Sequence, residues 1–155
     1  MRHGVSAAAL AELATIYQPQ VTDHSDTGSE ATVQAALRIE APKQGAALWR
    51  NNSGATLDND GRMIRYGLGN DSKRINDVWK SSDLIGVIPV AWGGRTFGVF
   101  TAIEVKAPGW RGPRSARERA QAAFLQTVES LGGVGMFATS LDEYRARVWR
   151  LRSEN

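Results

Sequence analysis

The sequence predicts one α/β domain with a mixed central sheet flanked by helices. Three observations favour this class: two long apolar stretches meet at Gly93-Gly94, a helical pattern precedes them, and a helix, a short strand and a last helix follow. Elements in this order are typical of a sheet with helices on its faces. A chain of 155 residues suits one compact core.

Composition limits the kinds of protein that this chain can be. It is 42% hydrophobic and 23% charged, which is typical of a globular protein. It has no cysteine, so disulfides and thiolate metal sites are excluded. No apolar run reaches the roughly 18 to 20 residues that a membrane span needs. We therefore expect a soluble cytoplasmic protein without a membrane partner.

The first 28 residues are expected to lie outside the main domain. Ser6 can cap a helix that runs to about Tyr17, and Pro19 is a suitable stop. The polar stretch that follows, from Gln20 onward, is typical of a linker. We therefore divide the chain into a helix with its linker, residues 1–28, and a main domain, residues 29–155.

The main domain is expected to begin with a helix and a small hairpin. Ser29 to Arg38 has helical periodicity, and Pro42 should end any continuation. Ala46 to Asn51 is predicted to be a short strand. The turn residues Asn59-Asp60-Gly61 lead into a second extended segment, Met63 to Tyr66, so that a hairpin is expected there.

A polar loop is predicted after this hairpin, and the longest strands follow it. We expect Gly67 to Trp79 to be a loop with one helical turn near Ile75 to Trp79. Leu84 to Trp92 and Thr96 to Lys106 then flank Gly93-Gly94, which is a strong signal for a two-residue hairpin turn.

The hairpin turn predicts which residues face each other. With Trp92 opposite Arg95, counting outward places Asp83 opposite Glu104. Directly opposed side chains share a face of the sheet, with Cβ atoms about 4.5 to 5.5 Å apart. Lys106 lies on the same face as Glu104, because side chains alternate along a strand. A bulge, or Pro89, would shift the register and send Asp83 to the other face.

Two opposed carboxylates require a compensating charge. Like charges across a sheet are destabilising, so such a pair needs a cation or a protonated acid. Oxygen ligands without cysteine favour Mg²⁺ or Mn²⁺ over zinc. The chain is thus expected to hold a divalent metal between Asp83 and Glu104.

The C-terminal part should alternate helix, strand and helix. A helix is predicted from about Ser115 to Leu131, where Gly132-Gly133 ends it, with an apolar stripe of Ala120, Phe124, Val128 and Leu131. Val134 to Ala138 is predicted to be a strand, and Leu141 to Leu151 a helix with Tyr144, Val148 and Leu151 facing inward.

Arginine is concentrated in two groups. One contains Arg111, Arg114, Arg117 and Arg119, and the other contains Arg145, Arg147, Arg150 and Arg152. A guanidinium can contact phosphate oxygens in a bidentate way, so both groups are candidate nucleic-acid contacts. Solvated helix faces explain such clusters equally well.

Several motifs in order resemble the VRR-NUC branch of the PD-(D/E)XK nuclease superfamily. The set extends over residues 29–140 and comprises Glu30 with Gln34, Arg50-Asn51-Asn52 with Gly54, Ser82-Asp83-Leu84-Ile85-Gly86, Ile103-Glu104-Val105-Lys106, and Gln121. Two departures are Ser82, where many relatives have proline, and a long insertion from Leu57 to Trp79 that would alter substrate choice.

The resemblance implies a restriction-endonuclease-like fold and a role for each motif residue. It implies that Asp83, Glu104 and the Val105 carbonyl bind Mg²⁺ or Mn²⁺, with Glu30 adding or orienting a ligand. Lys106 would position the attacking water or stabilise the transition state, and Gln121 would support the site.

The resemblance also implies a partner and a setting. It implies a homodimer that cuts branched DNA, such as a Holliday junction, in a bacterial cell or phage-infected host. Residues 1–28 lie outside the resemblance and are a candidate dimer element. Arg50, Asn51 and Asn52 would touch phosphate or else order the strand end.

Two other functions stay open at this point. One is a catalytically silent nucleic-acid-binding module, and the other is a sequence-specific restriction-type endonuclease. The individual residues also have simpler explanations: Glu30 can complement a helix dipole, Asp83 can be a turn residue, and Lys106 can protect a strand edge. Their joint placement is what favours catalysis.

Overall fold

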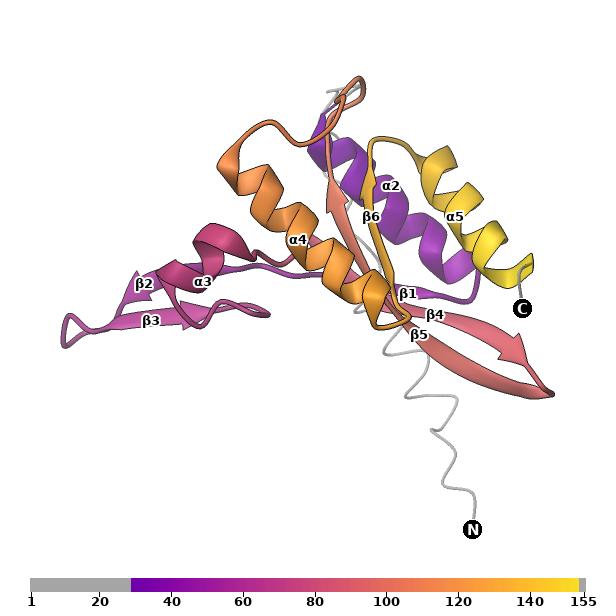
Figure 1. Cartoon of the computed structure of the whole chain (residues 1–155), viewed down its shortest axis with the longest axis horizontal. Helices are drawn as coiled ribbons and strands as arrows, with labels where there is room; N and C mark the ends of the chain where they lie inside the picture. Colours follow the sequence, from indigo (N-terminus) through magenta and orange to yellow (C-terminus); the bar gives the residue numbers. More distant parts are fainter. Residues whose placement is uncertain (1–28, 154–155) are drawn as a thin grey trace, which may run out of the picture.

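The computed structural model describes residues 29–153, so the helix predicted from Ser6 to Tyr17 lies outside the described residues. The elements in chain order are α2 (Glu30–Lys43), β1 (Ala47–Arg50), β2 (Gly54–Leu57), β3 (Met63–Tyr66), α3 (Lys73–Val78), β4 (Leu84–Trp92), β5 (Arg95–Val105), α4 (Ala116–Ser130), β6 (Val134–Ala138) and α5 (Leu141–Ser153). The predicted α/β class with a mixed central sheet is confirmed (Figure 1).

The central sheet has the strand order β1-β4-β5-β6. β1, β4 and β5 pair antiparallel, and β6 is parallel to β5. The β4–β5 register runs without interruption from Trp92–Arg95 to Leu84–Ile103, as the two-residue turn predicts. Gly93 and Gly94 both have positive φ, 56° and 73°, which a type I′ turn requires.

Pro89 lies within β4 without shifting this register. Backbone N–H groups point alternately to the two sides of a strand. In the β4–β5 register, the backbone N–H of a residue at position 89 would point toward β1. β1, however, pairs with β4 only as far as Val87. The N–H that proline lacks would therefore have met a free edge, where proline is tolerated.

Helices cover the two faces of the sheet unequally. α2 and α5 pack on one face, over a core that includes Leu37, Leu84, Ile103 and Tyr144. α4 packs on the other face, where Phe124 and its neighbours cover Ala102. Figure 1 shows α4 on one side of β5 and β6, with α2 and α5 on the opposite side. Because side chains alternate along β5, Glu104 and Lys106 face α4 together with Ala102.

Residues 54–78 lie outside the central sheet and are here named the arm. The arm consists of the two-stranded sheet β2–β3, which projects from the body in Figure 1, followed by α3, which packs against α4. The predicted hairpin partner was wrong: β3 pairs with β2, whereas the strand at Ala47–Arg50 pairs with β4. Because apolar and polar residues do not alternate in the four residues of β2, the sequence did not predict this strand or its pairing with β3.

Other corrections concern the helix ends. α2 continues to Lys43 and contains Pro42, which the prediction placed beyond the helix. The side chain of Ser29 caps the start of this helix, as expected. Leu131 is the C-cap of α4 and is 82% exposed, so it does not belong to the buried stripe. α5 extends two residues past the predicted end at Leu151.

Within residues 29–153, no helix is both long and apolar enough to cross a membrane.

Candidate active site

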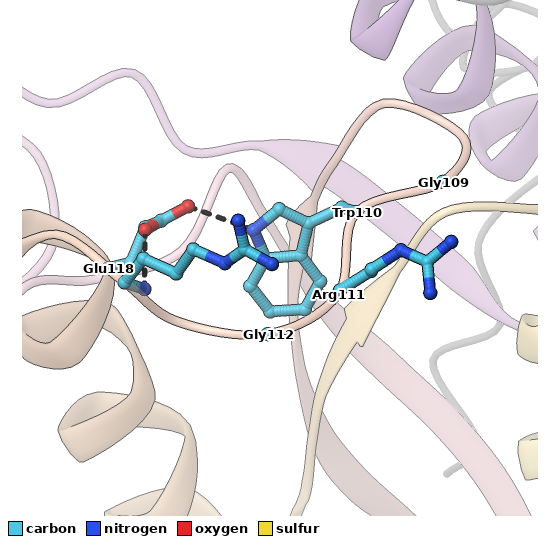
Figure 2. Close-up of a pocket in the computed structure, with 6 residues that line it drawn as sticks. Gly109, Trp110, Arg111, Gly112 and Glu118 are labelled. Atoms are coloured by element: carbon cyan, nitrogen blue, oxygen red, sulfur yellow. Dashed lines mark hydrogen bonds between the residues drawn. The ribbon is translucent and has the colours of Figure 1, made fainter.

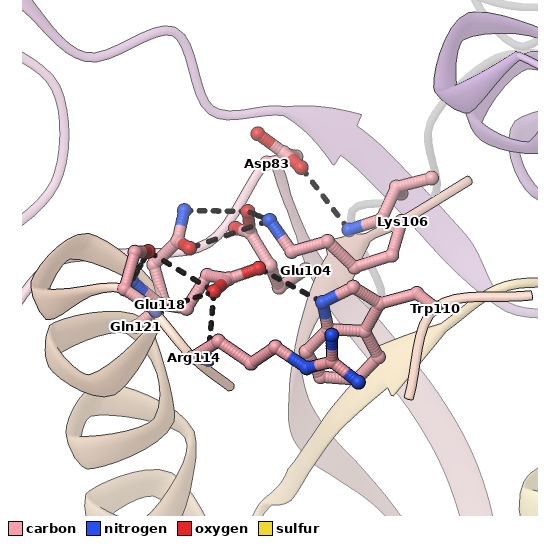
Figure 3. Close-up of polar contacts among 9 residues, drawn as sticks. Asp83, Glu104, Lys106, Trp110, Arg114, Glu118 and Gln121 are labelled. Atoms are coloured by element: carbon pink, nitrogen blue, oxygen red, sulfur yellow. Dashed lines mark hydrogen bonds and ion pairs between the residues drawn. The ribbon is translucent and has the colours of Figure 1, made fainter. Parts of the chain in front are cut away.

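The predicted central residues meet where β4 begins and β5 ends. Asp83 precedes β4, and its Oδ2 accepts a hydrogen bond from the backbone N–H of Val105 at 3.0 Å. This side-chain bond continues the β4–β5 ladder by one step, so the carboxylate is fixed beside the end of β5 (Figure 3). The expectation that Asp83 and Glu104 lie together rests on the same register.

Glu104 and Lys106 form a buried cluster with Gln121 of α4. Lys106 Nζ lies 2.9 Å from Glu104 Oε1 and 3.4 Å from Gln121 Oε1. Gln121 Nε2 donates to the same Glu104 oxygen. The three side chains come from β5 and the facing helix, and all of them are buried. Figure 3 shows them converging on one carboxylate oxygen.

The second oxygen of Glu104 has no such partners. Among the described residues, Glu104 Oε2 is a buried acceptor without a hydrogen bond. The pKa of Glu104 is raised to about 7, first by burial and then by the nearby negative charge of Asp83, against the opposing effect of Lys106. A buried carboxylate oxygen without a donor is costly, and a cation at this position would relieve the cost.

The residues around this oxygen fit a hard divalent ion. Glu104 Oε2 and the Asp83 carboxylate would be its two carboxylate ligands. Val105 directs its N–H to Asp83, and in an extended strand the N–H and carbonyl of one residue point to the same side, so its carbonyl lies on that side too. Oxygen ligands of this kind suit Mg²⁺ or Mn²⁺.

Glu30 stands apart from this pair. It is exposed in the first turn of α2, whereas Gln34, one turn later, lines a cleft that reaches Asp83. Within residues 29–153, no three His, Cys, Asp or Glu side chains are grouped so as to hold a metal ion. Among the described residues, the candidate ligands at this position are the two carboxylates and the Val105 carbonyl.

A polar cleft of about 430 Å³ opens beside Asp83. The residues that line it come from α2, the end of β1, the arm and α4, and they are Gln34, Arg50, Asn51, Asn52, Ser53, Tyr66, Asp83 and Arg117. Four of the predicted nucleic-acid contacts thus share one cleft with the candidate metal ligand.

Asn51 has a structural use for its polar side chain. It donates to Ser81 Oγ and to the carbonyl of Ser82, and it accepts from the backbone N–H of Leu68. Its own N–H donates to the Asp83 carbonyl at 2.8 Å. These bonds favour the alternative in which Asn51 orders the strand end. Arg50 and Asn52 are exposed at the cleft and keep the phosphate alternative open.

Arg111 and Arg114 line a different pocket of about 290 Å³, with Trp110 and Glu118 (Figure 2). Glu118 accepts hydrogen bonds from the Trp110 indole and from the backbone of Arg114 and Ser115, each at 2.8 Å. These donors lower the pKa of Glu118 to about 2, with the Ser115 backbone as the largest cause. The loop after Lys106 is therefore held in one shape by a single carboxylate.

The arginines of α5 mostly hold the fold together. Arg145 pairs with Glu40 at 2.8 Å, Arg147 pairs with Glu129 at 3.0 Å, and Arg152 donates to two backbone carbonyls. Arg150 lacks such a bond within the described residues. A structural role accounts for this cluster better than phosphate binding does.

Sequence patterns gave no sign of two residues at the site. Lys80 is half-buried and fixed by its backbone N–H to the Ala120 carbonyl. Burial lowers the pKa of Lys80, and Arg117 lowers it further, while Glu104 and Asp83 act in the opposite direction. Tyr66 joins the cleft from the arm, which the sequence did not connect to Asp83.

The chain matches no known family model, no curated protein and no solved structure. The site is therefore interpreted from its own geometry.

Proposed function

We propose that the protein is a Mg²⁺- or Mn²⁺-dependent endonuclease that hydrolyses phosphodiester bonds in DNA. The observation that carries the proposal is the buried, unpartnered Oε2 of Glu104 beside Asp83, with Lys106 on the same face. The central sheet with helices on both faces agrees with a restriction-endonuclease-like fold, and the ordered motifs resemble the VRR-NUC branch.

Each residue of the site has its own proposed role in hydrolysis. Asp83, Glu104 and the Val105 carbonyl would hold the divalent ion, which would lower the pKa of a bound water and place positive charge near the phosphate. Lys106 is held by Glu104 and Gln121, so its ammonium is preorganised to orient the attacking water or to stabilise charge on the phosphorane-like transition state. Gln121 keeps both partners in place and is a positioning residue.

The cleft beside the carboxylates provides the phosphate contacts. Arg50 and Arg117 are exposed there on opposite elements, and guanidinium groups bind phosphate oxygens well. We propose branched DNA, such as a four-way junction, as the substrate. A two-fold homodimer would present two sites to opposed strands, and a strictly monomeric active enzyme in light scattering would refute that part.

The first experiment is cleavage of labelled four-way junction, flap, duplex and single-stranded DNA in EDTA, Mg²⁺ or Mn²⁺. Wild type should cut only with metal, and Asp83→Ala should not cut. Asp77→Ala is the matched control, since Asp77 is exposed on the arm and pairs only with Lys73 among the described residues. Cutting by Asp83→Ala, or cutting in EDTA, would refute the proposal.

One observation favours a second candidate, a catalytically silent nucleic-acid-binding module. Lys106 already neutralises one oxygen of Glu104 in a buried ion pair, so the pair can serve as structure alone. Metal-independent DNA binding by wild type with no cleavage of any substrate would support the module. Loss of cleavage with retained binding in Glu104→Ala would support the nuclease.

A further inference from the structure

The arm carries an aromatic ring that is held on one face. Tyr66 is the last residue of β3, and Gly54 is its cross-strand partner. A Cβ at Gly54 would lie 2.6 Å from the Cζ atom and 3.2 Å from the Cε2 atom of the Tyr66 ring. The ring therefore lies against the Gly54 backbone, and it occupies space that only glycine leaves free. Tyr66 nevertheless stays 50% exposed.

The buried side-chain amide of Asn70 fixes the backbone at Tyr66 and at its partner Gly54. Asn70 is 5% exposed, and its Nδ2 donates to the carbonyls of Gly54 at 2.6 Å and of Tyr66 at 2.8 Å. These bonds join the two strand ends that hold the ring. Asn51 in turn accepts from Leu68 N–H at 3.1 Å and binds the backbone next to Asp83, so the arm is tied to the site.

Tyr66 is one of the residues that line the cleft with Asp83, Arg50 and Arg117. An aromatic face beside two guanidinium groups and a carboxylate matches the parts of a nucleotide: the face stacks on a base, and the guanidinium groups bind phosphates. A base inside a duplex is already stacked on both sides. Only a base that has left its stack can use the ring.

We propose that Tyr66 is a base-stacking platform that selects DNA in which the nucleotide beside the scissile phosphate is unpaired. The inference rests on the proposed nuclease function and specifies its substrate class. It also assigns a role to the arm, which places the aromatic side chain of Tyr66 in the same cleft as Asp83. Tyr66 is thus a specificity-determining residue, and the chemistry stays with Asp83, Glu104 and Lys106.

The test compares the rate of cutting of a flap, which carries unpaired nucleotides, with that of a fully paired duplex of the same sequence. Stacking on an aromatic side chain contributes about 1 to 3 kcal/mol per base, so Tyr66→Leu should lower the flap-to-duplex ratio of kcat/KM by roughly 5- to 150-fold. Leucine keeps apolar bulk over Gly54 but offers no aromatic face. Tyr66→Phe should retain the ratio, because the face and not the hydroxyl acts.

Two further variants separate stacking from general damage to the arm. Gly54→Ala keeps the tyrosine but displaces its ring, and it should lower the ratio as Tyr66→Leu does. Met63→Ala changes an exposed residue on the opposite face of β3 and should leave the ratio unchanged. An equal loss on flap and duplex, or an unchanged ratio in Tyr66→Leu, would overturn the inference.

A binding measurement makes the outcome independent of catalysis. DNA with 2-aminopurine at the unpaired position is titrated in Ca²⁺, and stacking on Tyr66 should quench its fluorescence. Wild type and Tyr66→Phe should quench it, whereas Tyr66→Leu should not. If wild type cuts no substrate, the proposed function fails. Quenching that depends on Tyr66 then still supports the platform, and quenching that is equal in all variants refutes it.

Discussion

The buried carboxyl of Glu104 makes a quantitative prediction for the metal-free protein. Its pKa in the folded state is about 7, against 4.5 for an ordinary glutamate, mainly because burial disfavours the charge. Below pH 4.5 the group is protonated in both states. As the pH rises from 4.5 to 7, the unfolded chain loses the proton first, so the folded state becomes less stable.

The size of the effect follows from the two pKa values. Each pKa unit corresponds to about 1.4 kcal/mol, so ionised Glu104 should cost the folded protein about 3 kcal/mol above pH 7. Glu40 and Glu118, whose pKa values are lowered from 4.5 to about 2, lose their stabilising contributions as the pH falls from about 4.5 to 2. They do not disturb the comparison between pH 5 and 8.

The assay is urea unfolding in EDTA, followed by circular dichroism, for wild type and Glu104→Gln. The free energy of unfolding of wild type should fall relative to that of the variant as the pH rises, by an amount of this order. Mg²⁺ should flatten the wild-type slope, since a cation favours the ionised carboxylate. Equal slopes for both proteins would refute the buried charge, and a slope indifferent to Mg²⁺ and Mn²⁺ would refute the metal site.

Three further predictions concern other parts of the molecule. Lys106→Met should reduce kcat by about 10²- to 10³-fold on any DNA that wild type cuts, because a preorganised charge is lost, and single-turnover cleavage measures this. Arg117→Ala should weaken DNA binding and lower the salt slope by about 1 in filter-binding titrations, whereas Arg147→Ala, whose side chain pairs with Glu129, should leave the slope unchanged. Gly86→Ala should prevent stable folding, seen as lost thermal cooperativity, because its Cβ would collide with the Ala47 carbonyl across the β1–β4 pair.

Local patterns were sufficient to predict the part of the fold that carries the carboxylates. Gly93-Gly94 determines a two-residue turn, and the turn alone sets every pairing back to Leu84–Ile103. Side-chain alternation then gives the face of Glu104 and Lys106. The position of Gln121 needed a further step, because it depends on which face of the sheet α4 covers. These inferences succeed because each one depends on a short stretch of chain.

The structure of the arm could not be predicted from local sequence patterns. β2 is four residues long and pairs with β3 along its whole length, and the buried amide of Asn70 bonds the carbonyls of Gly54 and Tyr66 at one end of this pair. A polar residue such as Asn70 in a glycine-containing segment indicates a loop when only the sequence is considered. Its hydrogen-bond partners become close only in the folded chain. For the same reason, Tyr66 could not be connected with Asp83.

The structure also distinguishes arginines that line the cleft from arginines that form ion pairs within the fold. Along the sequence, Arg117 and Arg147 belong to similar clusters. In the structure, Arg147 is paired with Glu129, whereas Arg117 faces the cleft with Asp83 and is close enough to Lys80 to lower its pKa. Among the described residues Arg117 forms no ion pair, and under the proposed function its guanidinium would bind a phosphate in this cleft.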